Sequence, residues 1–420
     1  MKKSIILLLY FFTIITCQAQ SSNAFVRTNN LLAQKDFFAA RDLYHSKKSS
    51  LSEVNRLITE ANIDHIFNRL KSSNQKIELL FQKYNHSMSD SVKYKLYSIR
   101  QINHGKLYEY KEAFAVIDQL LNSYSQFMTN EEKQDFANTR LIWKALSGQP
   151  KQQIRITEET ALKIKRDKAG LATIRVTHGK DSSAFIFDTG ANLSTVTESM
   201  AKKFGMQFLE GVIDVTAITG NTVKSHIAVC PEINLGHIQV RNAVFLVFPD
   251  SALAVPAIQY QMHGIIGFPV IEALREIQIT KSEELIVPLK STIYASQNMA
   301  LDFLTPIIEL NGDSYTFDTG ANTTILYRTY FLKHQKDIEQ NYKIQELQFG
   351  GAGGTIRKQG YQITFSPTIN NKVLRMDSVQ VYTDVIKADE GHLSGNIGQD
   401  LIRRFDKMII SFASMSIQFK

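Results

Sequence analysis

The hydrophobic and polar residues follow two different patterns along the chain. Between residues 20 and 152, apolar residues recur every three or four positions, as they do along one face of a helix. Examples are Ile77, Leu80, Phe81 and Tyr84, and also Ala113, Val116, Ile117, Leu120 and Leu121. From about residue 155, short β-branched runs alternate with Gly, Asn and Asp, which is typical of strands joined by turns. The pattern predicts an all-α N-terminal domain over residues 20–152 and a mostly β remainder.

The helical part is expected to consist of helical hairpins. It contains few Gly and no Pro before Pro150, and the sequence Gly148-Gln-Pro150 closes it. Residues 105–113 partly resemble a tetratricopeptide repeat, although no constant period extends over the segment. A helical cap or spacer is the favoured interpretation. The alternative is a docking surface for a protein partner or a substrate.

The β part contains two hairpin patterns of the same kind. The expected strands are Leu171–Val176, Ala184–Phe187, Pro306–Leu310 and Tyr315–Phe317. The first two strands flank a turn at residues 178–181, and the last two flank Asn311-Gly312, a pair that favours a tight hairpin turn. Each hairpin ends immediately before an Asp-Thr-Gly sequence.

The chain repeats the hexapeptide Phe-Asp-Thr-Gly-Ala-Asn, at Phe187–Asn192 and at Phe317–Asn322. A chance recurrence in 420 residues is improbable, on the order of one in a million. The two Asp residues of the motif are 318 − 188 = 130 positions apart. Two pairs of glycines repeat at nearly the same distance, Gly220 and Gly350 at 350 − 220 = 130 and Gly267 and Gly398 at 398 − 267 = 131. These landmarks predict a tandem duplication, with a first lobe over residues 153–290 and a second over residues 291–420.

The duplication supplies two carboxyl groups, on Asp188 and Asp318. Duplicated units tend to pack about a pseudo-twofold axis, which brings equivalent residues together. Two carboxylates that meet cannot both ionise, so one keeps its proton while the other loses it. Such a pair can hold a water molecule, which the ionised Asp deprotonates while the protonated Asp donates to a carbonyl oxygen. This chemistry requires neither a metal ion nor a covalent nucleophile.

These motifs resemble those of the pepsin and retropepsin aspartic proteases. The resemblance covers residues 160–420, where each Asp-Thr-Gly-Ala turn is followed by a Gly-containing hairpin and then by an apolar-apolar-Gly sequence. It implies a bilobed acid protease fold of two tandem β-barrel lobes. In that fold Asp188 and Asp318 would form the catalytic dyad, and Thr189 and Thr319 would tie the lobes together. Ala191 and Ala321 follow the Asp-Thr-Gly sequences, and alanine at this position is the residue of the retroviral-type enzymes. The chain is therefore similar to a fusion of two retropepsin-like lobes.

The resemblance also assigns the other candidate site residues. The active-site turns comprise Thr189, Gly190 and Ala191, and Thr319, Gly320 and Ala321. The flap or substrate-binding candidates are Thr219, Gly220, Asn221, Gly350 and Gly351, and the lobe glycines are Gly267 and Gly398. It implies no metal ion and no cofactor, and the expected substrate is a polypeptide.

The first 19 residues have the pattern of a secretory signal peptide. Lys2 and Lys3 precede an apolar run over residues 5–15, and Cys17-Gln-Ala19 forms a small-x-small cleavage sequence. The run is too short to span a bilayer as a helix, and no other run is long enough. We therefore expect an exported protein, periplasmic or extracellular, with no transmembrane span. Lipidation of Cys17 is the minority alternative.

The composition bears on the class of protein and on possible nucleic-acid, disulfide and metal interactions. The apolar fraction of 44% and the charged fraction of 21% are those of a globular protein. Removal of Lys2 and Lys3 lowers the net charge from +8 to +6, and the excess is diffuse, so nucleic acid is not an expected partner. Loss of Cys17 leaves Cys230 alone, which makes an internal disulfide impossible. The histidines show no metal-ligand spacing.

The leading hypothesis is an exported aspartic endopeptidase that works as a single bilobed chain. A catalytically silent peptide-binding or scaffolding protein with the same fold is the alternative. A third arrangement would pair lobes between chains, although the linker Pro288–Leu304 is long enough for pairing within one chain. The sequence does not specify the substrate, the pH optimum or whether the helical domain is retained.

Overall fold

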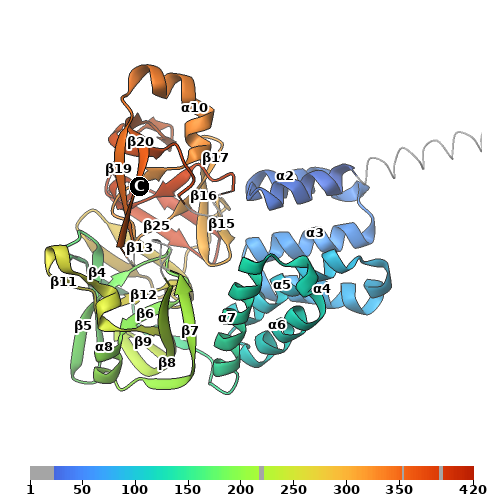
Figure 1. The fold of residues 1–420 in the computed structure, drawn as a ribbon, viewed down its shortest axis with the longest axis horizontal. Helices are drawn as coiled ribbons and strands as arrows, with labels where there is room; N and C mark the ends of the chain where they lie inside the picture. Colours follow the sequence, from blue (N-terminus) through green and yellow to red (C-terminus); the bar gives the residue numbers. More distant parts are fainter. Residues whose placement is uncertain (1–22, 217–221, 352–353, 387–390) are drawn as a thin grey trace, which may run out of the picture.

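The computed structural model describes residues 23–216, 222–351, 354–386 and 391–420, and it places a helical part beside a β part (Figure 1). The expected signal peptide over residues 1–19, with Cys17, lies outside the described residues. Helical residues 23–33 come first, and the named helices follow. These are α2 (Phe37–Lys47), α3 (Glu53–Ile66), α4 (Leu70–Tyr84), α5 (Asp90–Lys106), α6 (Tyr110–Tyr124) and α7 (Asn130–Leu146), with short 3₁₀ turns η1 (Lys48–Ser50), η2 (Asn85–Ser87) and η3 (Ser125–Phe127). None of the helices within these ranges is long and apolar enough to cross a bilayer.

The helices form hairpins whose turns are built alike, which confirms the expected helical hairpins. Lys35, Asn68 and Tyr108 lie in the turns that precede α2, α4 and α6, and each has a positive φ, of 61°, 59° and 56°. A hydroxyl side chain at Ser52, Ser89 or Thr129 caps the N-terminus of α3, α5 or α7. The caps lie 89 − 52 = 37 and 129 − 89 = 40 residues apart, so the unit recurs with unequal length. Unequal lengths explain why the sequence shows no constant period.

The first unit (residues 153–290) contains a nine-stranded sheet within the described ranges, in the order β1-β9-β6-β12-β5-β4-β8-β7, with β3 beside β4. Its strands are β1 (Gln153–Arg155), β3 (Lys165–Arg166), β4 (Ala172–His178), β5 (Asp181–Phe187), β6 (Ser194–Thr197), β7 (Gln207–Thr216), β8 (Thr222–Leu235), β9 (Ile238–Phe248) and β12 (Gly264–Ile266). Smaller elements are α8 (Glu198–Lys203), η4 (Asp250–Leu253), β10 (Ala254–Val255), η5 (Pro256–Ile258), β11 (Tyr260–Gln261) and α9 (Phe268–Ala273).

The second unit (residues 291–420) contains a sheet with the order β15-β16-β17-β24-β18-β23-β20-β19. Its strands are β15 (Met299–Asp302), β16 (Thr305–Leu310), β17 (Asp313–Phe317), β18 (Ile325–Leu326), β19 (Gln345–Gly351), β20 (Gly354–Phe365), β23 (Met376–Tyr382) and β24 (Gly395–Ile397). Its smaller elements are α10 (Arg328–Asn341), β21 (Thr368–Ile369), β22 (Lys372–Val373) and α11 (Gln399–Ile402).

The strand order shows that the two sheets are built on one plan. In each sheet the strand that ends at the Asp-Thr-Gly turn runs parallel to the apolar-apolar-Gly strand, which is β12 beside β5 and β24 beside β17. The next strand is antiparallel in both sheets, β6 beside β12 and β18 beside β24. A parallel partner then follows, β9 beside β6 and β23 beside β18. The structural correspondence agrees with the duplication inferred from the sequence.

The expected hairpins lie where the sequence places them. β4 and β5 pair up to His178 opposite Asp181, and β16 and β17 pair up to Leu310 opposite Asp313. Asn311 and Gly312 have φ of 55° and 78°, as the two central residues of a type I′ turn do. All four predicted strands are confirmed to within a few residues at their ends.

A further sheet joins the two units. The two units share a five-stranded sheet, β2 (Thr160–Lys163), β14 (Glu284–Val287), β13 (Glu276–Thr280), β25 (Lys407–Ser411) and β26 (Ser416–Phe419). Strand β13 of the first unit pairs with β25 of the second along five residues, from Glu276 opposite Ser411 to Thr280 opposite Lys407. The expected linker Pro288–Leu304 also contains strand β15, which pairs with β16. Burial of apolar strand faces in one common core stabilises this pairing.

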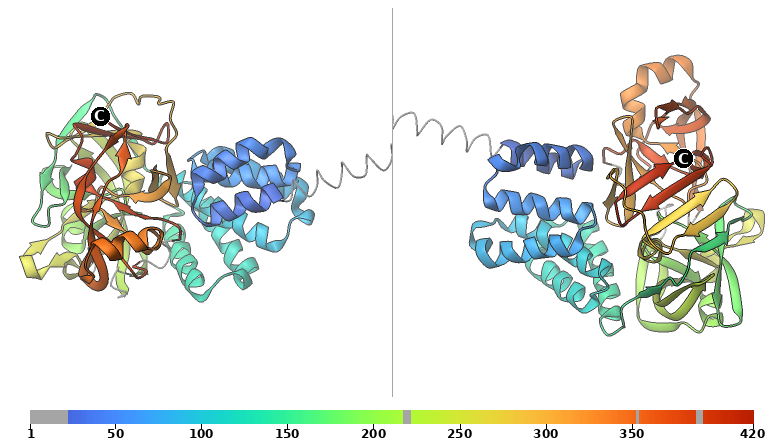
Figure 2. Two further views of the ribbon diagram at one scale, coloured as in Figure 1. Left: turned by 90° about the horizontal axis from the view of Figure 1, so that it is seen from above. Right: turned by 180° about the vertical axis from the view of Figure 1, so that it is seen from behind.

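The helical part contacts both units, and the two further views of Figure 2 show it on one side of both sheets. Tyr110 and Leu146 of the helices pack with Ile213 and Val244 of the first sheet in one apolar cluster. At the other end of the stack, residues of α2 and α3 pack against the second sheet in a cluster of Phe37, Phe38, Tyr44, Ile63, Ile66, Phe67, Ala300, Ile307, Ile325, Tyr327, Leu347, Tyr382, Ile386 and Leu393. Both contacts bury apolar surface, so the helices and the sheets stabilise each other.

A buried polar network joins the helices to α9, the helix that follows Gly267. The Lys106 ammonium donates to Asn68 Oδ1 at 2.7 Å and lies 3.3 Å from Glu272 Oε1. Asn68 in turn donates to the same carboxylate at 2.6 Å. The Tyr108 hydroxyl donates to the Pro269 carbonyl at 3.0 Å. Since a buried charge needs partners, the network fixes the α5–α6 turn against this part of the first unit.

His65 makes the helical part sensitive to acid. Burial lowers the pKa of His65 to about 4, and its Nδ1–H donates to Asn103 Oδ1 at 2.7 Å. Because the folded-state pKa lies below the unfolded value of about 6.5, the unfolded chain gains a proton first as the pH falls. The unfolding free energy that neutral His65 contributes is complete above about pH 6.5 and is lost as the pH falls from about 6.5 to 4.

We expect His65→Gln to reduce this loss. Between pH 7 and pH 5 the wild-type protein should lose about 2 kcal/mol of unfolding free energy through this residue, and the variant should not. Urea unfolding at both pH values measures the difference. The exposed His86, changed to Gln, is the matched control. An equal loss in wild type and His65→Gln would contradict the prediction.

Candidate active site

The two sheets deliver Asp188 and Asp318 to equivalent turns. Asp188 follows β5, and its N–H donates to the Ile266 carbonyl of β12 at 3.0 Å. Asp318 follows β17, and its N–H donates to the Ile397 carbonyl of β24 at 3.0 Å. Each Asp is therefore held at the end of an apolar strand by the parallel strand beside it.

Reciprocal hydrogen bonds between two buried threonines connect the turns. The Thr189 N–H donates to the Thr319 hydroxyl at 3.0 Å, and the Thr319 N–H donates to the Thr189 hydroxyl at 3.0 Å. Each hydroxyl then donates to the carbonyl before the opposite Asp, Thr189 to Phe317 at 3.2 Å and Thr319 to Phe187 at 2.9 Å. Both side chains are fully buried, so all their hydrogen-bonding capacity is used between the units.

The next residue of each turn is a glycine because the opposite carboxyl group occupies the space of a side chain. A Cβ on Gly190 would lie 2.8 Å from the carboxyl atoms of Asp318, and a Cβ on Gly320 would overlap the carboxyl group of Asp188. Any larger residue would push the two turns apart. The structure thus brings Asp188 and Asp318 together in one chain.

The carboxyl groups of the pair are also oriented by backbone N–H groups. Asp188 Oδ1 accepts from Gly190 at 2.8 Å and from Ala191 at 3.1 Å, and Asp318 Oδ1 accepts from Gly320 at 2.7 Å. Burial, followed by the charge and hydrogen bond of Asp318, raises the pKa of Asp188 well above its ordinary value. Two carboxyl groups in contact titrate as a pair and share one proton.

Gly267 and Gly398 support the two turns from behind. A Cβ on Gly267 would lie 2.6 Å from the Leu193 backbone, and a Cβ on Gly398 would lie 2.7 Å from the Thr323 backbone. The residue after each glycine donates its N–H to the alanine carbonyl of the turn, Phe268 to Ala191 at 2.8 Å and Gln399 to Ala321 at 2.9 Å. The predicted glycines and alanines therefore belong to one contact in each unit.

Each turn also contains a hydroxyl residue, Ser194 or Thr324, that was not among the predicted site residues. Gly267 donates its N–H to Ser194 Oγ at 3.0 Å, and Gly398 donates to Thr324 Oγ1 at 3.1 Å. The two hydroxyls stand at the offset of the duplication, 324 − 194 = 130, so the repeat itself carried the signal. Ser194 and Thr324 lock the apolar-apolar-Gly strand to the turn.

The flap candidates fall in different places. Thr219, Gly220 and Asn221 lie outside the described residues, between β7 and β8. Gly350 and Gly351 end strand β19, and Gly351 pairs with Gly354 of β20 at the end of that hairpin. The two hairpins are equivalent in sheet order, since β7 and β19 are each the edge strand beside the longer partner.

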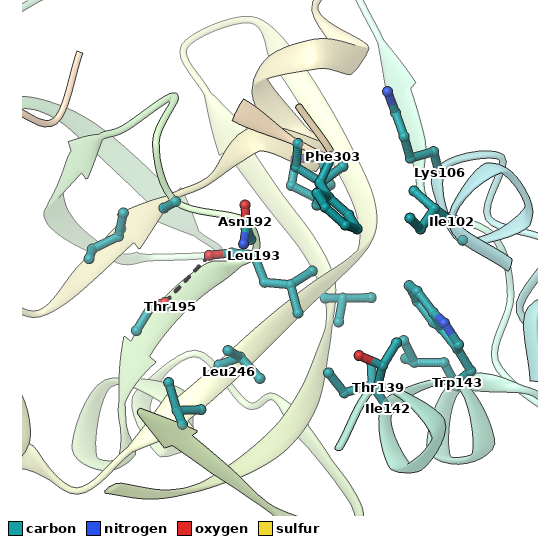
Figure 3. A pocket seen from close by; sticks show the side chains of 18 of the residues that line it. Ile102, Lys106, Thr139, Ile142, Trp143, Asn192, Leu193, Thr195, Leu246 and Phe303 are labelled. Atoms are coloured by element: carbon teal, nitrogen blue, oxygen red, sulfur yellow. Dashed lines mark hydrogen bonds between the residues drawn. The ribbon is translucent and has the colours of Figure 1, made fainter. Parts of the chain in front are cut away.

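A cavity of about 760 Å³ begins at the first turn. Asp188, Gly190 and Ala191 line one end of it. The opposite wall comes from the helices, with Trp143 and Thr139 of α7 facing the strands across the cavity (Figure 3). The sequence does not indicate which helical residues form this wall, because Thr139 and Trp143 meet the Asp188 turn only in the folded chain.

Other reactive groups lie apart from this site. No group of three or more His, Cys, Asp or Glu side chains in the described part of the chain is placed to hold a metal ion. Cys230 is buried in the core, where burial raises the pKa of its thiol to about 11. It is a core residue and not an activated thiolate.

Comparison with known proteins identifies part of the chain. A family model described as aspartyl protease matches residues 172–270. Residues 172–270 belong to the aspartyl protease family. The match begins at β4 and ends within α9, so it contains the Asp188 turn and Gly267. The second unit with Asp318 lies beyond the matched aspartyl protease segment and is related to it by the repeated motif and strand order. No curated protein matches the chain.

The pair of Thr189 and Thr319 is expected to be a major source of stability. Thr319→Val keeps the side-chain shape, but it leaves the buried Thr189 N–H without its acceptor and the Phe187 carbonyl without its donor. We expect the unfolding free energy to fall by about 3 kcal/mol in urea titrations. Thr177→Val, at a partly exposed position of β4, should change it by less than about 0.5 kcal/mol. Equal effects of the two variants would contradict this prediction.

Asp188→Asn is expected to stabilise the protein at neutral pH. A raised carboxyl pKa means that the stability contributed by Asp188 is complete below its unfolded pKa and is lost as the pH rises through the folded value. Asn does not titrate, and its oxygen can still accept from Gly190 and Ala191. The thermal midpoint of the variant should therefore exceed that of wild type at pH 7 and match it near pH 3. An equal shift at both pH values would show that the charge is not responsible.

Proposed function

We propose that the chain is an exported aspartic endopeptidase whose catalytic dyad is Asp188 and Asp318. The observation that carries the proposal is the contact of the two Asp turns, which brings the carboxyl groups of Asp188 and Asp318 together. A pair of carboxyl groups that shares one proton supplies an acid and a base side by side. The aspartyl protease match over residues 172–270 supports the same reaction class.

In the proposed reaction, a water molecule lies between the two carboxyl groups. Asp318 accepts a proton from this water while the water oxygen attacks the carbonyl carbon of a peptide bond. Asp188 donates its proton to the carbonyl oxygen, which gives a neutral tetrahedral diol. At this point Asp188 is ionised and Asp318 is protonated.

The second step returns the protons and cleaves the bond. Asp188 accepts a proton from one hydroxyl of the diol as the carbonyl re-forms. The peptide nitrogen receives the proton of Asp318, and the carbon–nitrogen bond breaks. The products are a carboxylic acid and an amine, and the dyad regains its starting protonation. Because a sequence of this kind depends on both groups, the loss of either one should stop it.

The bilobed arrangement and the export of the protein are also part of the proposal. Residues 153–290 and 291–420 act as the two lobes, with the reciprocal threonine bonds and the shared sheet supporting a single-chain enzyme. The signal-like pattern over residues 1–19 supports export to the periplasm or the cell exterior. The buried Lys106 network supports a helical domain that stays with the mature enzyme.

The test is the cleavage of a denatured protein by wild type, Asp188→Asn and Asp318→Asn across acid to neutral pH. Each dyad variant is expected to lose at least about 10³-fold in kcat/KM, because proton transfer in the transition state is lost. Asp214→Asn, at an exposed position of β7, is the matched control and should retain wild-type activity. Circular dichroism verifies that all variants are folded.

Three results would contradict the proposal. Full activity of either dyad variant would exclude the dyad mechanism. Absence of cleavage by folded wild type would favour a peptide-binding or scaffolding protein instead. Recovery of activity on mixing Asp188→Asn with Asp318→Asn would show that lobes pair between chains, since only exchange between chains can unite the two intact Asp residues.

A further inference from the structure

Three hairpin turns of the helical part contact the β part in the same way. In the turns before α2, α4 and α6, the residue with positive φ extends its side chain to a residue of the β part. These contacts are Lys35 with Asp302 at 2.7 Å, Asn68 with Glu272 at 2.6 Å, and Tyr108 with the Pro269 carbonyl at 3.0 Å, to which Gln152 also donates at 3.1 Å. A left-handed conformation is rare for a bulky residue such as Tyr108, so this contact is made at a cost in backbone energy. Two of the three turns end on the short helix α9.

A buried charge pair strengthens the contact with α9. The ammonium of Lys106, whose side chain is 3% exposed, lies 3.3 Å from the carboxylate of Glu272. Asn68 bridges the two groups, since its Oδ1 accepts from Lys106 at 2.7 Å and its Nδ2 donates to Glu272 at 2.6 Å. Polar groups that satisfy each other away from water hold a fixed arrangement. The charge pair therefore fixes α9 relative to the α3–α4 and α5–α6 turns.

Helix α9 stands directly behind the Asp188 turn. Gly267 precedes it, and Phe268, its first residue, donates its N–H to the Ala191 carbonyl at 2.8 Å. Ala191 donates its own N–H to Asp188 Oδ1 at 3.1 Å. The Lys106 ammonium lies 5.3 Å from the centre of the Phe268 ring, within the range of a cation–π contact. A continuous series of contacts thus runs from the helical part to the carboxyl group of Asp188.

The equivalent turn of the second unit is supported by different residues. Gln399 takes the place of Phe268, and its side-chain amide donates to the Thr319 carbonyl at 2.8 Å. The Gln399 Oε1 accepts from Arg166 of β3 at 3.2 Å. This turn is supported by the β part, whereas the support of the Asp188 turn includes the helical part.

We propose that the helical part is a positioning element for the dyad, in which Lys106 and Glu272 hold α9 against the Asp188 turn and so orient the carboxyl group of Asp188 for proton transfer. The inference rests on the proposed peptidase function. Lys106 and Glu272 are positioning residues, because they act on Asp188 through Phe268. Proton transfer depends on the geometry of the carboxyl group, so a displacement of α9 lowers the rate of the chemical steps without weakening substrate binding.

Two double variants test the proposal, and both replace the buried charge pair by neutral side chains. In Lys106→Met/Glu272→Gln, the new amide oxygen can still accept from Asn68, so α9 keeps this tether. In Lys106→Met/Glu272→Ala, the acceptor is lost. Replacing both charges together avoids an unpaired buried charge, so both variants should fold. Circular dichroism and the thermal midpoint verify the folding of each protein.

Cleavage of fluorescein-labelled casein gives kcat and KM for each protein. We expect the kcat of Lys106→Met/Glu272→Ala to fall at least about tenfold, with KM within about twofold of wild type, because small displacements of reacting groups lower rates on this scale. Lys106→Met/Glu272→Gln should keep kcat within about threefold. The matched control is Arg41→Met, which removes a 2.7 Å hydrogen bond from α2 to the Gln297 carbonyl of the second unit and does not touch α9. The control should keep both constants.

Three kinetic results would overturn the positioning role and leave the peptidase proposal intact. The first is an unchanged kcat in Lys106→Met/Glu272→Ala. The second is a raised KM with unchanged kcat, because Lys106 and Glu272 would then contact the substrate directly. The third is an equal loss of kcat in Arg41→Met, which would assign the effect to a general loosening of the helical part.

A double-mutant cycle measures the coupling without any cleavage. Asp188→Asn is introduced into both double variants, and their urea unfolding is measured at pH 7. The effect of Asp188→Asn on the unfolding equilibrium constant should differ between the two backgrounds by at least about threefold, since groups in one network are coupled. Coupling in a protein that cleaves nothing would support the positioning of Asp188 by the helices and remove the peptidase. Equal effects in the two backgrounds would overturn the positioning.

Discussion

The contact of two Asp-Thr-Gly turns is the constraint on which the rest of the structure depends. The buried hydroxyl groups of Thr189 and Thr319 each form hydrogen bonds with the opposite turn. Gly190 and Gly320 have no side chain, which leaves room for the two carboxyl groups to meet. Burial, followed by the charge and hydrogen bond of Asp318, raises the pKa of Asp188.

The two sheets hold this unfavourable contact in place. Each Asp ends a hairpin strand, and a parallel strand with a glycine at its end holds the turn from behind. The shared sheet then joins the units at a distance from the dyad, through β13 and β25. Because the joining strands bury apolar residues in one core, the energy that opposes separation of the units does not come from the site itself.

The helical part is packed against both sheets. It packs on the second sheet through α2 and α3 and on the first through α6 and α7. The Lys106 network links it to α9, which starts immediately after Gly267. Opposite acid responses follow within one protein. Protonation of His65 weakens the helical part, whereas protonation of Asp188 is already favoured in the folded site.

The sequence by itself determined the dyad turns, the supporting glycines, the hairpins and the change from helix to strand at about residue 150. These features depend on local backbone preferences and on a repeated motif, both of which are visible in one dimension. Even Ser194 and Thr324 could have been found from the repeat. Only the tertiary structure decided the shared sheet, the position of β15 inside the expected linker and the wall that α7 adds to the cavity. Those features arise from packing between segments far apart in the chain, for which an apolar periodicity specifies a buried face but not its partner.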